Sequence, residues 1–252
     1  MSIGSHIPVN LVGLSKYQTE QIFIKSPMSM TSRTILTPRK IHNDKLLFIH
    51  SAYTLNACNR KFHKNIIESL VDDFNYLVQS VSPKYISNGD KIKLYSPGVI
   101  LHMGKAVGQP VGQAIESYRE LIVKMYEFIP TGYKLILETG CGCGSEVLSD
   151  PKALLEFYNT LDKSKIGICI DSAHIFGFGV PVNRAILELF DYKISLIHLN
   201  DSEVPFGSKK DRHSNLGKGY IWKDKISELS QFIKDCYDNV IPVLAETPSP
   251  PW

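Results

Sequence analysis

Histidine and acidic side chains recur at the ends of short apolar segments in this 252-residue sequence. Six such segments end on a residue that can bind a metal ion, namely His50, His102, Glu138, Asp171, His198 and Glu246. Three more candidates lie just downstream of these ends: His174, Asp211 and His213. Imidazole nitrogens and carboxylate oxygens without cysteine favour catalytic zinc, where one position stays open to water. The pattern predicts a metal site built from residues that are far apart along the chain.

The number of candidates exceeds what one ion needs. They suffice for three centres with about three to four protein ligands each, provided that a carboxylate bridges two of them. Taken singly, the histidines could be structural and the aspartates could cap helices or turns. The joint pattern favours a metal cluster, which generates hydroxide near neutral pH and neutralises charge on a phosphoryl oxygen. This is the chemistry of phosphoester hydrolysis.

Eight short apolar segments are the predicted strands that must position these side chains. They span residues 2–7, 21–25, 46–50, 98–102, 134–138, 165–171, 194–198 and 241–246. Longer segments with helical spacing lie between them, as at Ile66, Leu70 and Phe74. This alternation indicates βα units around a parallel sheet. In a parallel barrel the carboxyl ends of the strands meet at one face, so the candidate ligands should point into one pocket.

The sequence therefore predicts an α/β protein with a TIM (β/α)8 barrel in one domain, residues 1–252, because barrels of about 250 residues are common as single units. Two connections depart from the regular repeat. Residues 8–20 are too short and too rich in turn residues for a full helix after the first strand. Residues 247–252 contain three prolines, which cannot sustain a helix. We expect a reduced first helix and no eighth helix.

The composition excludes several classes of protein. The chain has 28 Lys+Arg and 25 Asp+Glu, a net charge of +3, so a nucleic-acid partner would have to bind a local basic patch. Charged residues are 21% and aromatic residues 10% of the chain, which excludes a mainly disordered protein. No apolar run approaches the length of a membrane span, and the first residues lack a secretory signal. We expect an intracellular monomer that has no membrane partner and is not secreted.

Five cysteines are too few and too scattered for a disulfide framework, so we expect reduced thiols. Cys141 and Cys143 form a C-x-C pair that could bind a soft metal ion. No second cysteine pair completes a four-thiolate site, which disfavours that interpretation.

The motifs around the candidate ligands are FIHSAYTLN at 48–56, ILHMG at 100–104, LET at 137–139, CIDSAH at 169–174, IHLNDS at 197–202, DRHSNLG at 211–217 and AETP at 245–248. In order, and over nearly the whole chain, they resemble the endonuclease IV family of apurinic/apyrimidinic (AP) endonucleases. The resemblance implies a TIM barrel with three zinc ions that incises double-stranded DNA on the 5′ side of an abasic site. The products would be a 3′-hydroxyl and a 5′-deoxyribose phosphate, and trimming of 3′ ends is a further implied activity.

The resemblance also implies a role for each ligand. His50, His102 and Glu138 would hold the first zinc ion. Glu138 would bridge to a second ion held also by Asp171, His198 and Glu246, and the third would be held by His174, Asp211 and His213. A hydroxide between the first two ions would attack phosphorus while the third ion stabilises the departing 3′-oxygen. Glu138 and Glu246 are therefore the implied catalytic residues, with Glu246 orienting or deprotonating the hydroxide.

Recognition of abasic DNA in this family involves bending the DNA and filling the gap in the base stack with loop side chains. The implied DNA-binding residues are Tyr53, Asn56, Lys209, Lys210, Arg212 and Lys218. Two positions depart from the family pattern: Thr54 replaces a larger apolar wedge, and the loop after Lys25 lacks an arginine. Met28 or Met30 could serve as substitute wedges. His6, at another strand end, could lie in the layer around the metal ligands.

Two other functions fit the same pattern less well. A sugar isomerase or epimerase shares the barrel and the strand-end ligands but usually needs only one or two ions, so Asp211 and His213 separate it from a nuclease. A catalytically silent DNA-binding scaffold would have no need for the complete ligand set.

Overall fold

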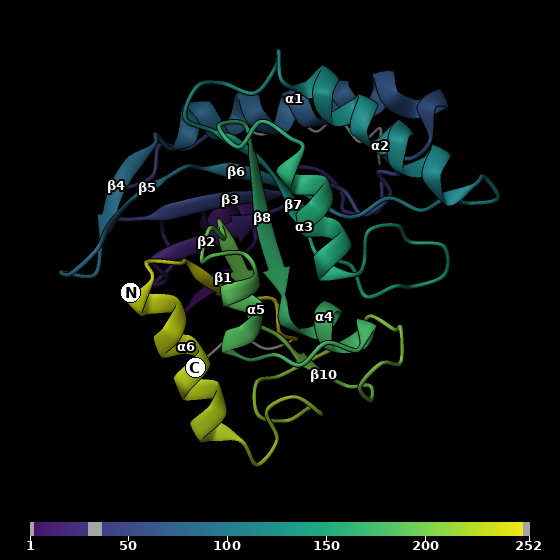
Figure 1. The fold of residues 1–252 in the computed structure, drawn as a ribbon. Helices are drawn as coiled ribbons and strands as arrows, with labels where there is room; N and C mark the ends of the chain where they lie inside the picture. Colours follow the sequence, from purple (N-terminus) through teal and green to yellow (C-terminus); the bar gives the residue numbers. More distant parts are fainter. Residues whose placement is uncertain (1–2, 30–36, 249–252) are drawn as a thin grey trace.

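The computed structural model describes residues 3–29 and 37–248 and contains a closed barrel of eight parallel strands (Figure 1). Around the barrel these are β1 (Gly4–His6), β2 (Thr19–Ile22), β3 (Leu46–His50), β6 (Gly98–Leu101), β7 (Lys134–Glu138), β8 (Ile166–Asp171), β9 (Leu196–His198) and β12 (Val243–Ala245). β12 pairs with β1 and closes the ring. The predicted TIM barrel is confirmed, with most strands shorter than predicted. The predicted bounds of the second strand, 21–25, are wrong, because β2 begins two residues earlier and ends at Ile22.

The strand register brings the strand ends to one level. His50 pairs with Ile100 at the end of β6, Glu138 pairs with Cys169 in β8, and Asp171 pairs with His198 in β9. Since all eight strands are parallel, their last residues face the same end of the barrel. Ligand candidates that are distant in sequence therefore become neighbours in space.

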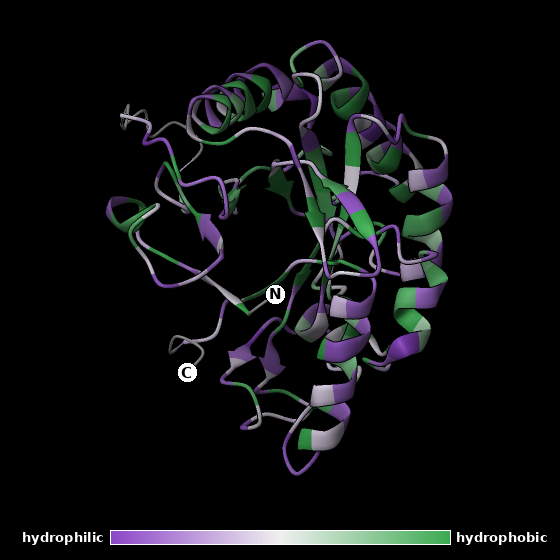
Figure 2. Ribbon diagram, turned by 90° about the vertical axis from the view of Figure 1, so that its left-hand side faces the viewer, coloured by the Kyte–Doolittle hydropathy of each residue, from purple (hydrophilic) through white to green (hydrophobic). Residues whose placement is uncertain are grey.

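Helices cover much of the outside of the barrel. They are α1 (His63–Ser80), α2 (Val111–Met125), α3 (Pro151–Asn159), α4 (Ser172–Phe178), α5 (Arg184–Leu189) and α6 (Ile226–Asp238). The predicted apolar stripe of α1 is buried at Ile66, Leu70 and Phe74. In Figure 2 the helices carry both hydrophilic and hydrophobic residues, whereas the barrel strands are largely hydrophobic.

The first helix is reduced, as predicted. The connection from β1 to β2 contains only the short 3-10 helix η1 (Val9–Leu11). The buried Glu20 of β2 holds this connection in place, because its carboxylate accepts hydrogen bonds from the Gly13 amide at 2.8 Å and the Ser15 hydroxyl at 2.6 Å. Lys45 Nζ lies 2.5 Å from Glu20 Oε1 and balances the charge of the carboxylate.

The structure also departs from the sequence-based expectation at other connections. Within residues 23–29 and 37–45, the described part of the β2 to β3 connection, there is no helix, and we did not predict this. After β12, residues 246–248 are not helical. The predicted absence of an eighth helix also concerns residues 249–252, which lie outside the described residues.

Several small elements were also missed. An antiparallel hairpin, β4 (Lys84–Ser87) and β5 (Ile92–Tyr95), precedes β6, and the 3-10 helix η2 (Arg60–Phe62) precedes α1. A second antiparallel pair, β10 (Asp201–Ser202) and β11 (His213–Ser214), aligns Ser202 with His213. This pair folds the chain after β9 back over the carboxyl face of the barrel. Across the described ranges, none of the helices combines the length and apolar character that spanning a bilayer requires.

Candidate metal centre

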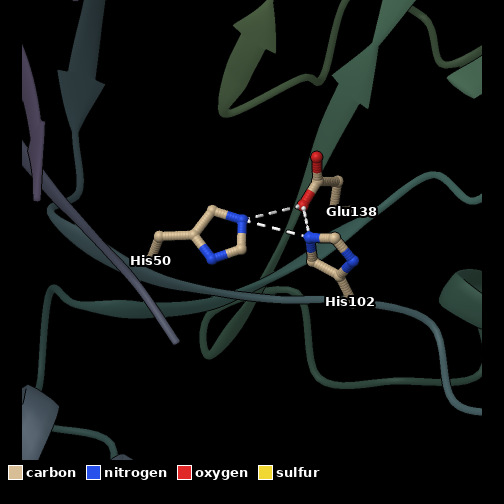
Figure 3. Close-up of side chains that lie close together, drawn as sticks. All are labelled: His50, His102 and Glu138. Atoms are coloured by element: carbon tan, nitrogen blue, oxygen red, sulfur yellow. Dashed lines mark hydrogen bonds and ion pairs between the residues drawn. The ribbon is translucent and has the colours of Figure 1, made fainter. Parts of the chain in front are cut away.

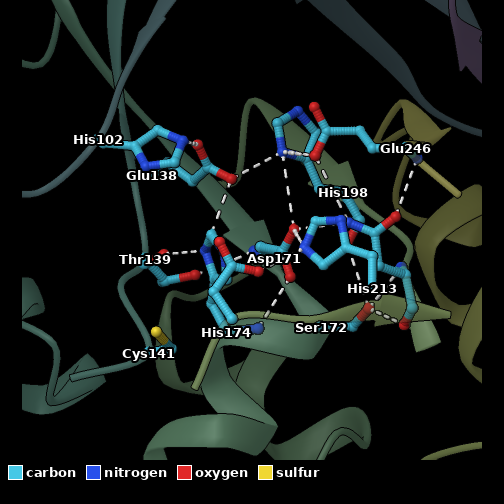
Figure 4. Close-up of polar contacts among 12 residues, drawn as sticks. His102, Glu138, Thr139, Cys141, Asp171, Ser172, His174, His198, His213 and Glu246 are labelled. Carbon is cyan, nitrogen blue, oxygen red and sulfur yellow. Dashed lines mark hydrogen bonds and ion pairs between the residues drawn. The ribbon is translucent and has the colours of Figure 1, made fainter. Parts of the chain in front are cut away.

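The nine candidate ligands lie together at the carboxyl end of the barrel (Figures 3 and 4). Strand ends supply His50, Glu138, Asp171 and His198, and the residues just after β6 and β12 supply His102 and Glu246. The remaining three come from α4 and from the β10 to β11 region: His174, Asp211 and His213. Asp171 also begins α4, because its carboxylate accepts a hydrogen bond from the His174 amide at 2.9 Å.

One group joins β3, β6 and β7. Figure 3 shows His50 and His102 pointing toward the same carboxylate oxygen of Glu138. The Nε2 atoms lie 3.3 Å and 3.0 Å from Glu138 Oε2, and 3.1 Å from each other. Two imidazole nitrogens and one oxygen at such distances enclose a position where a small cation could be held.

A second group uses the other oxygen of Glu138. His198 Nδ1 lies 2.8 Å from Glu138 Oε1, 3.2 Å from Glu246 Oε2 and 3.9 Å from Asp171 Oδ2. Each oxygen of Glu138 therefore faces a different group. This is the geometry of a carboxylate that can bridge two ions.

A third group lies beside the second. Asp211 Oδ2 lies 3.3 Å from His174 Nε2, and Asp211 Oδ1 lies 3.2 Å from His213 Nε2. His213 Nε2 is also 3.6 Å from Asp171 Oδ2, so Asp171 links the second and third groups.

The donor atoms of these groups fit metal ions. Three histidine rings use their other nitrogen to donate a hydrogen bond away from the groups: His50 Nδ1 to the Ser51 carbonyl at 2.8 Å, His174 Nδ1 to the Thr139 carbonyl at 2.8 Å, and His198 Nε2 to Gln21 Oε1 at 2.7 Å. This is how metal-binding histidines are usually oriented. Among the described residues, buried Glu138 Oε2 and His213 Nε2 have no aligned hydrogen-bond partner, as expected for atoms that face a cation.

The charges of the groups depend on one another. Burial opposes ionisation of Glu138, but the neighbouring His102 and His198 hold its pKa well below the usual range. Burial likewise opposes a proton on His213, while Asp171 and Asp211 raise its pKa to about 9. His213 therefore holds a proton that balances the neighbouring carboxylates. A metal ion must displace that proton, so its affinity should weaken as the pH falls.

Two buried amide side chains that sequence reasoning missed support the ligands. Gln21 donates from Nε2 to Glu246 Oε1 at 2.5 Å and accepts from His198, so it orients two ligands of the second group. Asn200 donates to Asp171 Oδ2 at 2.6 Å, and its Oδ1 accepts from the Glu246 amide at 2.9 Å. A polar residue directly before the apolar residues Ile22, Phe23 and Ile24 was the available signal for Gln21.

His6 lies in the layer around the ligands, where the sequence suggested it could be. Its Nδ1 is 3.2 Å from Gln21 Nε2, and its ring packs against Phe23 with centroids 4.8 Å apart. Burial lowers the pKa of His6 to about 4, so the ring is neutral and can accept a hydrogen bond from Gln21.

Asp201 organises residues 217–222, which follow Asp211 and His213 in the chain, a role that the sequence did not suggest. Its fully buried carboxylate accepts hydrogen bonds from five backbone amides at 2.9 to 3.3 Å, those of Ser202, Gly217, Gly219, Ile221 and Trp222. One side chain thus fixes a turn that lies next to β11.

Replacing Asp201 with alanine is expected to lower the free energy of unfolding by roughly 3 kcal/mol, because buried amides would lose their acceptor. Chemical denaturation of the wild-type and variant proteins measures this difference. Asp201→Asn keeps one acceptor oxygen and should lose less. Equal stability of Asp201→Ala and the wild type would show that water or other groups satisfy these amides.

The residues proposed for DNA contact have different surroundings. The Tyr53 side chain is 48% exposed, and its ring lies 5.1 Å from that of His50 and 5.2 Å from that of His102, at the entrance to the first group. Asn56 is engaged within the protein, since its side chain hydrogen bonds to the amide and the carbonyl of Lys105, both at 2.9 Å. Asn56 therefore links the segment after β3 to the segment after β6.

The basic residues near the third group are all exposed or partly exposed: Lys209, Lys210, Arg212 and Lys218. They flank Asp211 and His213 on the same segment of chain, so a polyanion bound there would lie next to the third group. Thr54 is also exposed, and Met28 is 71% exposed. Met30, the other proposed wedge, lies outside the described residues.

Residues 94–250 match a family model described as the xylose isomerase-like TIM barrel. A relative from Acanthamoeba polyphaga mimivirus named as a putative endonuclease 4 is 30% identical and aligns with 98% of this chain and 85% of its own length. A relative from Clostridium botulinum, named as a probable endonuclease 4, is 33% identical and aligns with 81% of this chain and 71% of its own length.

Solved structures share the fold. Endonuclease IV from Thermus thermophilus superposes with a TM-score of 0.70 at 21% identity, covering 100% of this chain and 94% of that one. A D-tagatose 3-epimerase-like protein superposes with a TM-score of 0.61 at 14% identity, covering 97% and 90% of the two chains. The barrel alone therefore does not separate a nuclease from a sugar-converting enzyme.

Proposed function

Because this chain belongs to the endonuclease IV family, we propose that it is a zinc-dependent endonuclease that hydrolyses the phosphodiester bond on the 5′ side of abasic sites in duplex DNA. The products are a 3′-hydroxyl and a 5′-deoxyribose phosphate, as base excision repair requires, and trimming of blocked 3′ ends accompanies this activity. In this proposal residues 1–252 act as one domain and as a monomer.

The proposed ligand sets follow the three groups. His50, His102 and Glu138 hold one zinc ion, and Glu138 shares a second with Asp171, His198 and Glu246. His174, Asp211 and His213 hold the third. Zinc ions bound there supply hydroxide near neutral pH and neutralise charge on the phosphate and on the leaving oxygen.

The protein's own side chains orient the reactants. Glu246 has one oxygen held by Gln21, while its other oxygen faces His198. Burial opposes its ionisation, but the neighbouring His198 outweighs this, and the pKa of Glu246 falls to about 2. Glu246 is therefore ionised at neutral pH and can accept a hydrogen bond or a proton from an attacking water. Glu138 fixes the spacing of the first two groups through its two oxygens.

The observation that carries the proposal is the third group, formed by Asp211 with His174 and His213. A sugar isomerase or epimerase needs one or two ions, which the first two groups already provide. A third set of ligands beside the others suits hydrolysis of a phosphodiester, because the attacking oxygen and the leaving oxygen both carry charge in the transition state. The basic residues on the same segment are consistent with a polyanionic substrate.

The test is incision of a duplex oligonucleotide that carries a single tetrahydrofuran abasic analogue, combined with metal analysis of the protein. We expect one cut, on the 5′ side of the analogue, and a product that a DNA polymerase can extend without further treatment. An undamaged duplex is the control. Failure of a zinc-loaded protein to cut the abasic duplex would contradict the proposal, and ketose epimerisation by the same preparation would favour the sugar-enzyme alternative.

Gln21 provides a test of the second group that does not depend on activity. Gln21→Leu keeps the size of the side chain but removes both hydrogen bonds to the ligands. We expect zinc affinity to fall by about 10- to 100-fold, the usual effect of losing a residue that orients metal ligands. Competition with a chromophoric chelator measures the affinity.

Gln79→Leu is the matched control for Gln21→Leu, because Gln79 is exposed on α1 and its side chain donates to the Asn75 carbonyl in its own helix. Its zinc affinity should equal that of the wild type. If Gln21→Leu also binds zinc as tightly as the wild type, Gln21 does not orient the ligands.

We further propose that the lysines beside the third group contact DNA phosphates, while Tyr53 stacks in the gap left by the missing base. The half-exposed ring of Tyr53 stands over the first group, where a flipped-out sugar would arrive. The pKa of the Tyr53 hydroxyl is raised by burial and by the surrounding carboxylates, so it stays protonated and can donate a hydrogen bond.

The Lys210→Gln and Lys218→Gln double variant is expected to bind abasic duplex DNA more weakly, because two phosphate contacts are lost. The slope of log affinity against log salt should become shallower by about 1.8. Fluorescence anisotropy at several salt concentrations measures the slope. Lys163→Gln with Lys193→Gln, which changes exposed lysines just before β8 and β9 at the opposite end of the barrel, is the control. Equal slopes for both double variants would exclude the proposed contacts.

A further inference from the structure

The loop after β7 holds two thiols that the proposed metal centre does not use. Cys141 is buried and Cys143 is partly exposed, and their sulfurs lie 3.0 Å apart. Figure 4 shows Cys141 beside the metal-ligand groups. The spacing of one intervening residue is short, so the backbone must turn sharply to bring both side chains to the same point.

The backbone around the two cysteines is held in that turn. Gly142, between them, has a φ of +77°, which favours glycine, and a side chain there would come within 3.1 Å of the Phe178 ring. The Gly142 amide donates to Glu146 Oε2 at 2.7 Å, and Ser149 donates to the same oxygen at 3.1 Å. The close approach of the sulfurs is therefore part of an ordered loop.

The same loop touches the segment that leads to the third group. Cys143 Sγ donates to the Lys209 carbonyl at 3.1 Å, and the Lys209 amide donates to the Gly177 carbonyl at 2.8 Å. Lys209 adopts a φ of +54°, which is uncommon for a residue with a side chain. The thiol of Cys143 is thus one of the groups that fix the backbone just before Asp211.

We propose that Cys141 and Cys143 form a reversible intramolecular disulfide at the rim of the candidate metal centre, and that this bond loosens the segment 207–210. The Cys143 thiolate attacks a small disulfide such as oxidised glutathione, forming a mixed disulfide and releasing one glutathione thiol. Cys141 then displaces the second glutathione. The two cysteines lose two protons and two electrons, and the oxidant becomes two thiols.

The order of attack follows from burial, because Cys143 is accessible whereas Cys141 is buried and burial raises its pKa to about 12. A disulfide across one residue closes a small ring and is readily reduced, so the reaction can reverse in a thiol buffer. After oxidation Cys143 has no proton to donate, and the Lys209 carbonyl loses that hydrogen bond.

A soft metal ion is a less suitable occupant. The groups of at least three candidate ligands among the described residues include neither Cys141 nor Cys143, so the pair offers only two thiolates to an ion. A disulfide needs no further partner. The other three cysteines, Cys58, Cys169 and Cys236, are all buried and should stay reduced.

The test equilibrates the full-length, metal-loaded protein with oxidised glutathione and then unfolds it in denaturant while the remaining thiols are alkylated with N-ethylmaleimide. Intact mass and peptide mapping should show three alkylated cysteines and an unmodified peptide that joins Cys141 to Cys143. Dithiothreitol should restore all five. Hydrogen exchange of residues 207–210 should be faster in the oxidised protein than in the reduced protein.

Cys143→Ser, which keeps a donor for Lys209, should alkylate at four cysteines before and after oxidation and show no change in exchange. Five alkylated cysteines in the oxidised wild type, a glutathione adduct that persists on Cys143, or a zinc or copper ion retained by Cys141 and Cys143 would each overturn the proposal. Unchanged exchange in a protein that does form the disulfide would overturn the link to segment 207–210. None of these readouts requires nuclease activity, so failure here is distinct from failure of the proposed function.

Discussion

Replacing Glu138 with glutamine is expected to reduce kcat for incision of abasic DNA by roughly 10³-fold or more, since an ion that loses its bridging carboxylate forfeits several kcal/mol of transition-state stabilisation. Glu138 has one oxygen in each of the first two groups, and an amide cannot bridge two cations. Single-turnover cleavage of a tetrahydrofuran duplex measures the loss, and mass spectrometry of metals shows its cause.

The same variant should retain about one zinc ion of three, because the ligands of the third group do not include Glu138. Damage binding should change little, since the DNA-contact residues proposed above are untouched. Glu156→Gln, on the outer helix α3, is the control and should behave as the wild type. Undiminished incision by Glu138→Gln would defeat the proposed mechanism.

Removing the metal ions with a strong chelator is expected to abolish incision and to lower the thermal stability of the protein. Each ion present at about 100 times its Kd stabilises the folded state by about 2.7 kcal/mol. Loss of each such ion should therefore reduce Tm by about 5–11 °C, because about 1 kcal/mol corresponds to about 2–4 °C for a chain of this size. Calorimetry and the cleavage assay together measure both effects.

Zinc added back after dialysis should restore activity and Tm together, whereas magnesium should not, because imidazole-rich sites suit zinc. Activity that persists in the chelated protein at a confirmed metal content near zero would exclude a metal mechanism. The measurement should be made above neutral pH, where protons compete least with the ion for His213 and its neighbours.

The eight strands and the convergence of nine ligands could be predicted because both depend on strong local patterns. Apart from β1 and β2, each barrel strand contains a short apolar run, and the parallel arrangement places the last residues of all the strands at one face. His50, Glu138, Asp171 and His198 are found at strand ends for that reason. The buried face of α1 could be predicted equally well, since its apolar residues recur with the period of a helix.

The parts that could not be predicted depend on contacts across long sequence distances. Gln21 and Glu246 are separated by 225 residues, and no local pattern connects them. Asp201 lies in the motif IHLNDS at 197–202, yet its five amide partners could be recognised only from the folded loop. Apolar periodicity identifies helices that are present, so it did not reveal that the described part of the connection between β2 and β3 lacks one.

The pairing of β1 with β12 has a consequence for synthesis of the protein. While the ribosome is still producing the chain, Gly4 and Ser5 lack their β12 partners, because Leu244 and Ala245 are made hundreds of residues later. The ring cannot close, and the Glu246 carboxylate is absent, until β12 and the residue after it have been made. Contacts of such large sequence separation form slowly. A nascent chain is therefore expected to lack a complete set of candidate metal ligands until β12 docks against β1 and β9.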